Sequence, residues 1–151
     1  MATGFGELKV FSGSAHGELT REIAAFLGVP LGQARLRRFP DTEVSFQIDE
    51  NIRITPAPGH TPGTIRIEFE SRGEKALFCG DILHHALQIY HPEWNSFACL
   101  DADNARKSRR AAVEYCAGSG ARLLPCHFGA PFTCHIDQKG NGFVPRFAGQ
   151  F

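Results

Sequence analysis

The chain has 151 residues, of which 42% are hydrophobic and 21% are charged. Such a balance is typical of a globular protein with one sizeable core, and it indicates neither disorder nor a membrane span. Sixteen basic and sixteen acidic residues cancel, so no overall field favours nucleic acid or an anionic membrane surface. We therefore expect neither nucleic acid nor a membrane as a partner.

The five cysteines predict the compartment. Their number is odd, they lack the CxxC spacing of metal sites, and no signal-like segment precedes the first expected strand. We expect free thiols and a reducing, cytoplasmic location. Cys126 and Cys134 lie close to His127 in the sequence, so a sulfur ligand stays open there, although free cysteines are more often small packing residues.

The N-terminal third predicts a strand, a helix and two paired strands. The short apolar run at 8–11 is the first strand. An apolar stripe at i, i+4, i+7 and i+8 then predicts a helix that ends at a glycine and a proline; the stripe consists of Leu19, Ile23, Phe26 and Leu27. Residues 34–39 and 44–48 are predicted to pair as strands.

A hairpin is predicted between residues 65 and 79. Ile65, Ile67 and Phe69 alternate with charged residues, and a turn at 71–74 leads into a second strand. One reversal returns the chain to the edge at which it started. His60 and Asp81, which flank the hairpin, are therefore expected at the same end of the sheet.

The rest of the chain alternates between irregular and regular segments. Residues 82–100 are expected to be irregular, with packing aromatics and surface histidines. A helix is predicted from a cap at Asp101 to Gly118, with its arginines facing water. A buried strand at 123–128 and a final hairpin turned at 139–142 follow.

Three side chains with metal-binding chemistry stand at the ends of these runs. His60 lies in the string PGHTPG, where glycine permits close backbone approach and proline stiffens the turn. Asp81 ends the run FCGD, and His127 follows LLPC. Two histidines and one carboxylate are a recognised ligand set for a single divalent ion. We predict these three as metal ligands. Further ligands would come first from His84, His85 and Cys126.

The strings GHTPG, GDILHH and LLPCH, within residues 54–147, resemble the C-terminal half of the metallo-β-lactamase superfamily, near methyl parathion hydrolase and the lactonases. The resemblance implies an α/β fold, a mixed sheet layered with helices as half of an αββα sandwich. It also implies a two-zinc centre of seven side chains, in which Asp81 is the shared catalytic carboxylate. Four of the seven come from an HxHxDH motif, and this chain contains no HxH pair. The resemblance also implies a small-molecule substrate, and we expect at most one zinc ion and impaired hydrolysis of an ester, lactone or phosphotriester.

A second resemblance covers residues 8–53, where KVFSGSA and RFPDTEVSFQI are similar to the N-terminus of ribose-phosphate pyrophosphokinase. It implies that the loop of Phe39, Asp41 and Glu43 lies on the adenine side of a nucleotide site. Thr42 stands where that family has glycine, and a β-branched residue resists positive φ.

Two resemblances in one chain predict two segments, residues 1–53 being pyrophosphokinase-like and 54–151 metallo-β-lactamase-like. The leading hypothesis is a metal-dependent hydrolase. The alternatives are a non-catalytic module that binds nucleotide or another subunit, and a chimeric chain with no activity. Half of a two-sheet sandwich leaves an apolar face in need of a cover, so we expect a homodimer or a poorly soluble chain.

Overall fold

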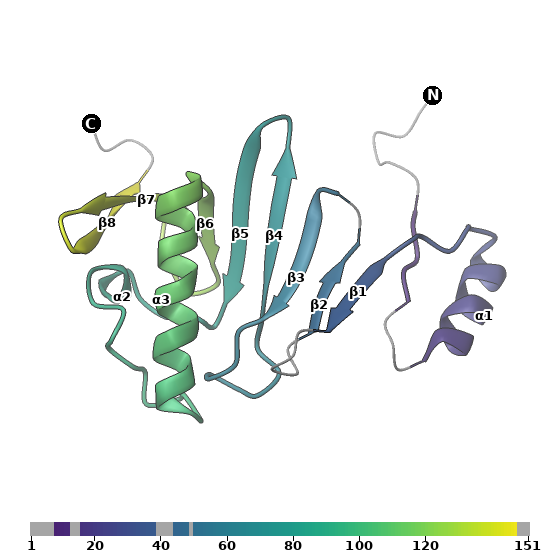
Figure 1. Ribbon diagram of the computed structural model, residues 1–151, viewed down its shortest axis with the longest axis horizontal. Helices are drawn as coiled ribbons and strands as arrows, with labels where there is room; N and C mark the ends of the chain where they lie inside the picture. Colours follow the sequence, from purple (N-terminus) through teal and green to yellow (C-terminus); the bar gives the residue numbers. More distant parts are fainter. Residues whose placement is uncertain (1–7, 13–15, 39–43, 49, 148–151) are drawn as a thin grey trace.

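The computed structural model describes residues 8–12, 16–38, 44–48 and 50–147 (Figure 1). All the strands that these residues form belong to one sheet of eight strands, arranged in the order of the sequence. The α/β class predicted from the sequence is confirmed. The elements are α1 (Gly17–Leu27), β1 (Arg35–Arg38), β2 (Val44–Gln47), β3 (Ile52–Pro56), β4 (Ile65–Ser71), β5 (Glu74–Gly80), α2 (Leu87–Tyr90), α3 (Ala102–Ser119), β6 (Arg122–Pro125), β7 (Cys134–Lys139) and β8 (Gly142–Phe147).

The direction of the strands decides which loops meet. Neighbouring strands are antiparallel except β5 and β6, which are parallel and are connected through α2 and α3. Since β3 and β5 both run antiparallel to β4, the strands β3, β5 and β6 share one direction. Their carboxyl ends therefore lie at the same edge of the sheet.

The two predicted hairpins are confirmed. The turn between β4 and β5 holds Arg72 at φ 53° and Gly73 at φ 81°. Positive φ at both central residues is the pattern of a type I′ turn, whose twist matches that of the strands it joins. The hairpin of β7 and β8 pairs six residues of each strand around its turn.

The ends of α3 follow from capping chemistry. Asp101 Oδ1 accepts hydrogen bonds from the N–H groups of Asp103 and Asn104 at 3.1 and 3.0 Å, as predicted for an N-cap. The predicted end at Gly118 is wrong by two residues. The left-handed conformation that stops the helix occurs at Gly120, with φ 71°.

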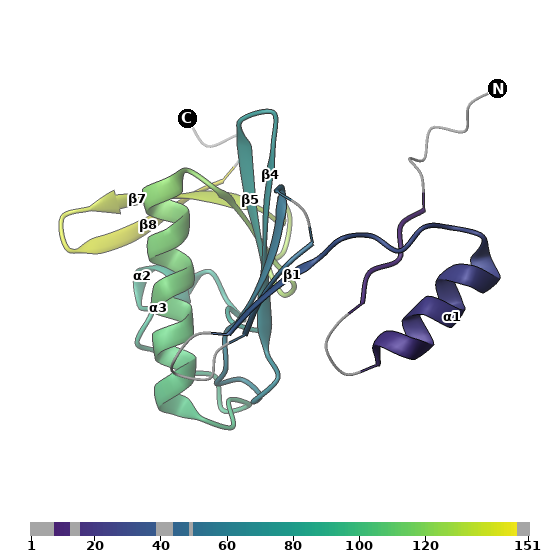
Figure 2. The same cartoon turned by 45° about the vertical axis from the view of Figure 1, so that its right-hand side comes forward.

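The core lies between α3 and one face of the sheet, as the two views in Figures 1 and 2 show. Apolar side chains of the helix stripe meet those of the central strands there. The cluster includes the fully buried Leu77, Leu123, Ala112, Val113 and Cys116. In the part of the chain that the structure describes, no helix combines the length and the apolar character needed to cross a bilayer.

The prediction that the arginines of this helix face water is wrong for Arg109. Its side chain is fully buried, because the segment after β5 folds over α3 and supplies three acceptors for the guanidinium. Arg110, the next residue, is exposed and pairs with Glu114.

The N-terminal segment is less regular than predicted. Val10 forms an isolated bridge with Leu31 in place of a strand at 8–11, whereas α1 agrees with the prediction and ends at Gly28. β1 pairs with β2, β2 with β3 and β3 with β4. Strand pairing thus continues across the predicted boundary between the two segments, and the assignment of two domains stays a prediction.

The buried thiols give a first prediction. All five cysteines are free, and three are buried, whereas Cys99 is half-buried and Cys126 is exposed. Burial raises the pKa of Cys116 to about 12 and that of Cys134 to about 11, and it raises the pKa of Cys79 as well. At pH 8 we expect dithionitrobenzoate to titrate about two thiols of the native chain, and all five after denaturation, because the thiolate is the reactive form. Rapid titration of a third native thiol would contradict this burial.

Candidate metal centre

Three loops at one edge of the sheet carry the side chains predicted as ligands. His60 lies between β3 and β4, Asp81 directly follows β5, and His127 lies two residues beyond β6. The predicted strand at 123–128 is thus shorter than expected and ends at Pro125. Because β3, β5 and β6 run in the same direction, all three loops leave the sheet at its same edge.

The loop that carries His60 is fixed against the start of α3 through its backbone. The carbonyl groups of Gly59 and His60 accept hydrogen bonds from the N–H groups of Asp101 and Leu100 at 2.9 and 3.1 Å. These bonds position the histidine without using its ring.

Gly59 permits this contact because it has no side chain. Its φ is 137°, and a Cβ added there would overlap the backbone N and Cα of Ala105. One turn farther along α3, Ser108 Oγ donates to the Pro58 carbonyl at 2.7 Å. The first glycine of GHTPG is therefore a requirement of packing as well as of backbone conformation.

The turn that follows Asp81 is organised by Gln88. Its Oε1 accepts hydrogen bonds from the N–H groups of His84 and His85 at 2.7 and 3.2 Å, and its Nε2 donates to the Trp94 carbonyl at 2.9 Å. Gln88 is buried, so these bonds are shielded from water. They fix the backbone of His84 relative to Asp81.

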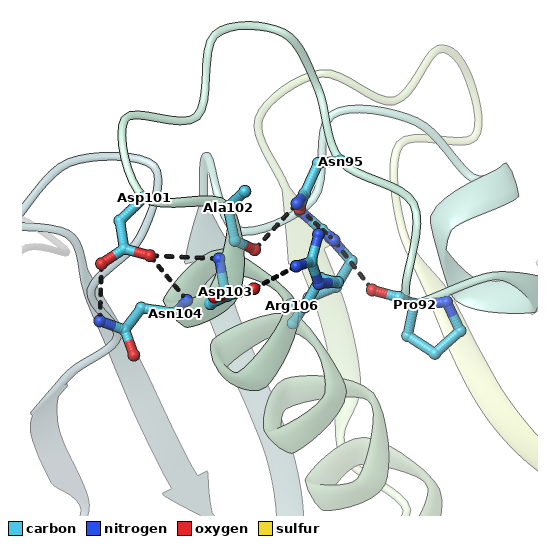
Figure 3. A network of polar contacts seen from close by, with 8 residues as sticks. Pro92, Asn95, Asp101, Ala102, Asp103, Asn104 and Arg106 are labelled. Atoms are coloured by element: carbon cyan, nitrogen blue, oxygen red, sulfur yellow. Dashed lines mark hydrogen bonds and ion pairs between the residues drawn. The ribbon is translucent and has the colours of Figure 1, made fainter.

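Arg109 fastens the same segment to α3. Its Nε donates to the Ile82 carbonyl at 3.1 Å, and its Nη1 donates to the Pro92 carbonyl and to Asn95 Oδ1 at 2.8 and 3.1 Å. Asn95 in turn donates to the Ala102 carbonyl at 2.8 Å, within the network at the start of α3 that Figure 3 shows. Burial holds the pKa of Arg109 below its usual value, but a guanidinium stays protonated in proteins. The buried guanidinium of Arg109 therefore holds both ends of the segment 82–95 against α3.

The two carboxylate oxygens of Asp81 each face one histidine. His127 Nε2 lies 2.6 Å from Oδ1, and His60 Nε2 lies 3.6 Å from Oδ2. The ring of His84 stacks on that of His127 with centroids 5.5 Å apart and 12° between the planes, and its centroid lies 4.9 Å from that of His60. Potential ligand atoms of Asp81, His84 and His127 all lie within 4.8 Å of one another.

His84 is the member of this cluster that was not among the three predicted ligands. Both of its ring nitrogens are buried without a hydrogen-bond partner among the described residues, and so is Nδ1 of His60. Burial, and then the neighbouring His60, lowers the pKa of His84. This shift favours the neutral ring of His84, which keeps a lone pair for a cation. Its position three residues after Asp81, in a tight turn, is the sequence signal that identifies it.

The other histidines of residues 82–100 have structural partners, in agreement with the prediction of surface positions. His85 is exposed, and its Nδ1 accepts a hydrogen bond from the N–H of Leu87 at 3.1 Å. His91 is exposed and stacks on Trp94, with centroids 4.2 Å apart.

The cysteines near His127 lie outside the cluster. Cys126 is exposed and Cys134 lies in the hydrophobic core, and the group of potential ligands found among the described residues contains neither. The loop predicted to contact a nucleotide, Phe39, Asp41 and Glu43, lies outside the described residues, and that prediction stays untested.

This arrangement suits one divalent cation. Two imidazoles and one carboxylate leave open positions on an ion such as zinc, and an ion would give a buried ring nitrogen of His84 the partner it lacks. His60 lies outside the group of three, with its Nε2 3.6 Å from Asp81 Oδ2, and its role as a ligand stays a prediction.

Residues 8–56 match the family described as the N-terminal domain of ribose phosphate pyrophosphokinase. Over 45 residues the chain is 51% identical to the ribose-phosphate pyrophosphokinase of Wolinella succinogenes and 49% identical to that of Campylobacter jejuni. Each stretch is 30% of this chain and 15% of the relative, so the chain spans a small part of these proteins. The resemblance seen in residues 8–53 is confirmed.

Solved structures resemble the chain over a longer range. AidC, a dizinc quorum-quenching lactonase, matches with a TM-score of 0.62 and 22% identity over 91% of this chain and 47% of that chain. The hydrolase AbOPH of the beta lactamase superfamily matches with a TM-score of 0.62 and 24% identity over 68% and 36% of the two chains. A probable metal-dependent hydrolase from Staphylococcus aureus matches with a TM-score of 0.58 and 19% identity over 71% and 39%.

These structures establish the fold. The chain has the fold of metallo-β-lactamase hydrolases and lactonases, as the resemblance of its sequence implied, and it spans less than half of each of the three solved chains. The cluster of Asp81, His84 and His127 lies in this fold as a set of groups that could hold a metal ion.

Proposed function

We propose that this chain binds one divalent metal ion, zinc in the first place, at Asp81, His84 and His127, and that the loaded chain hydrolyses an ester, lactone or phosphotriester slowly. The observation that carries the proposal is the pair of buried ring nitrogens of His84, which lack a partner among the described residues beside a carboxylate and a second histidine. Buried polar groups in proteins are normally paired, and a cation would satisfy this one.

The residues around the cluster support the same proposal. A bound divalent cation would supply a Lewis acid that polarises the carbonyl or phosphoryl oxygen of a substrate and lowers the pKa of water. The chain's own contribution is to hold the ligands in place. Asp81 Oδ1 is hydrogen-bonded to His127, and the backbone of His84 is oriented by Gln88. These contacts reduce the reorganisation that binding an ion would require.

The rate is expected to be low because of the number of ligands. Three side chains form the group that could hold an ion, whereas the resemblance of residues 54–147 implies a centre of seven. A second ion that would share the charge developed during hydrolysis has too few ligands among the described residues. A single ion is therefore expected to support slower hydrolysis than a pair of ions would.

The metal content tests the site. We expect about one zinc ion per chain in the wild type and in His91→Ala, and strongly reduced zinc in His84→Ala, because loss of a ligand from a three-residue set removes much of the affinity. Elemental analysis after gel filtration in buffered zinc measures this, with circular dichroism as the check on folding. His91 is a matched control because it is exposed and stacks on Trp94 outside the cluster. Two tightly held ions per chain, or undiminished zinc in His84→Ala, would contradict the proposed site.

Hydrolysis tests the activity separately. With an aryl ester and a lactone as substrates, we expect a weak rate that disappears with a chelator and in Asp81→Asn, since asparagine keeps the shape of aspartate but loses its charge. Comparison of the zinc-loaded and chelated chain, at equal protein concentration, measures it. A rate in the range of ordinary enzymes, with kcat of about 10 per second, would show that the site is more complete than three ligands allow.

The N-terminal segment supports no second activity in this proposal. The chain spans 15% of the pyrophosphokinases it matches, and the residues that would contact a nucleotide lie outside those the structure describes. Nucleotide or subunit binding by this segment remains the alternative, and a zinc-free chain that binds ATP would favour it.

A further inference from the structure

The sheet presents an apolar face on the side opposite α3. Directly opposed residues of neighbouring strands place their side chains on the same face. One such row crosses five strands through Phe46, Ile54, Ile67, Phe78 and Leu124. The adjacent row contains Ile52, Phe69 and Ala76 and ends at Arg122 of β6.

The other face of the same strands carries charge and packs on α3. Arg66 and Glu68 of β4 form an ion pair at 3.0 Å, Glu68 is buried, and the Arg66 guanidinium lies 5.4 Å from the ring centroid of Tyr115 in α3. The apolar rows therefore point away from α3. Figure 2 shows no described helix packed on that side of the sheet, and Phe78 is 44% exposed there.

The helix α1 carries a second apolar surface that its own chain leaves open. Its stripe of Leu19, Ile23, Phe26 and Leu27 is exposed, with Phe26 at 91%, and Ala24 is its one buried residue. In both Figure 1 and Figure 2 the helix lies beyond β1, away from the rest of the sheet. An isolated helix of 11 residues is marginal in water, since most helical stability in proteins comes from packing an apolar face.

The helix matches the sheet face in length and in chemistry. Five strands at ~4.8 Å spacing, each contributing about five residues of ~3.3 Å, outline a face of roughly 24 by 17 Å, or about 400 Å² in projection. An 11-residue helix is about 16 Å long, the depth of that face. A helix laid on a sheet is a standard way of burying both.

We propose that a second copy of this chain covers the apolar sheet face, with α1 of each copy packed across the apolar rows of the other. A two-fold dimer of this kind is closed, because the helix stripe of each copy covers the sheet face of the other and no such surface is left over. In projection, two sheet faces of about 400 Å² and two helices of about 16 by 10 Å come to roughly 1,100 Å², close to the lower end of the 1,200–2,000 Å² that stable interfaces bury. The formal net charge of the chain is zero, so no net repulsion between two copies opposes their association.

Light scattering after gel filtration, at tens of micromolar, tests the association. We expect a dimer for the wild type and a dissociation constant raised about thirtyfold or more in Phe26→Lys, because Phe26 is an aromatic anchor at the centre of the contact. Phe26 is nearly fully exposed in a single chain, so its replacement leaves the fold intact, which circular dichroism checks. Phe97→Lys is the matched control, since Phe97 is fully exposed in the segment before α3 and belongs to neither surface. A monomeric wild type, or equal dimer strength in the two variants, would overturn the proposal.

Photochemical cross-linking tests which surface α1 meets. With benzoylphenylalanine in place of Phe26, irradiation should give a product of twice the chain mass, joined to peptides that contain Ile52, Ile67, Phe69 or Phe78. A product within one chain would mean that α1 folds back on its own sheet. A product between chains that maps outside these strands would mean that another face forms the dimer, and either result would overturn the arrangement.

Discussion

Replacing Gly59 with alanine is expected to destabilise the chain by about 3 kcal/mol or more, and to lower Tm by about 6–12 °C, because an added Cβ overlaps backbone atoms that cannot rotate away. The atoms are the N and Cα of Ala105 and the carbonyl carbon of Asn104, the last at 2.6 Å. A φ of 137° is in addition a conformation that alanine rarely adopts. Relief of the overlap must move the loop off α3, which displaces His60 and loosens Asp81. Thermal unfolding followed by circular dichroism measures the loss.

Gly63 provides the control within the same string. A Cβ added there meets no atom within 4 Å, so Gly63→Ala should change Tm by a degree or two at most, since alanine in an open position costs little. Zinc content should follow the same order, with Gly59→Ala depleted and Gly63→Ala unchanged. Equal stability of the two variants would show that the loop does not rest on α3 as described.

Replacing Arg109 with methionine is the second change with a large expected effect. It leaves the carbonyl groups of Ile82 and Pro92 and the side-chain oxygen of Asn95 without their donor. Buried acceptors that lose a partner cost about 1–3 kcal/mol each, partly offset because methionine needs no burial of charge. We expect a net loss of about 2–4 kcal/mol by urea unfolding. Because the segment after β5 carries His84, zinc should also be lost at temperatures at which the variant is still folded.

Arg110→Met separates this effect from a general loss of charge on α3. Arg110 is exposed, and its partners are Glu114 and the ring of Phe143. Exposed contacts of this kind contribute less than about 1 kcal/mol to stability. Arg110 does not contact the segment that carries His84 through them, so the zinc content should not change. If Arg109→Met were no more destabilising than Arg110→Met, the buried guanidinium would not be what holds the segment in place.

Features that depend on neighbouring residues along the chain could be predicted from the sequence. The alternation of Ile65, Ile67 and Phe69 predicted β4, and the charge and spacing around Asp101 predicted the start of α3, because strand pleat and helix capping are local properties. His60 and Asp81 flank a single hairpin, and their convergence could be predicted for the same reason. The two resemblances followed from strings of residues and were visible without a fold.

Tertiary structure alone decided the features that depend on distant segments. Arg109 reads as a surface residue of an amphipathic helix, but its acceptors lie 14 to 27 residues earlier, on a segment whose path over α3 has no local signature. The sequence offered His84 only as one of three further ligands, and it was the parallel pairing of β5 and β6 that placed its ring against that of His127, 43 residues later, with both of its own ring nitrogens buried. Likewise α1 and the sheet each show an apolar face in the sequence. Whether these faces meet within one chain is set by the path of residues 28–34, which connect α1 to β1.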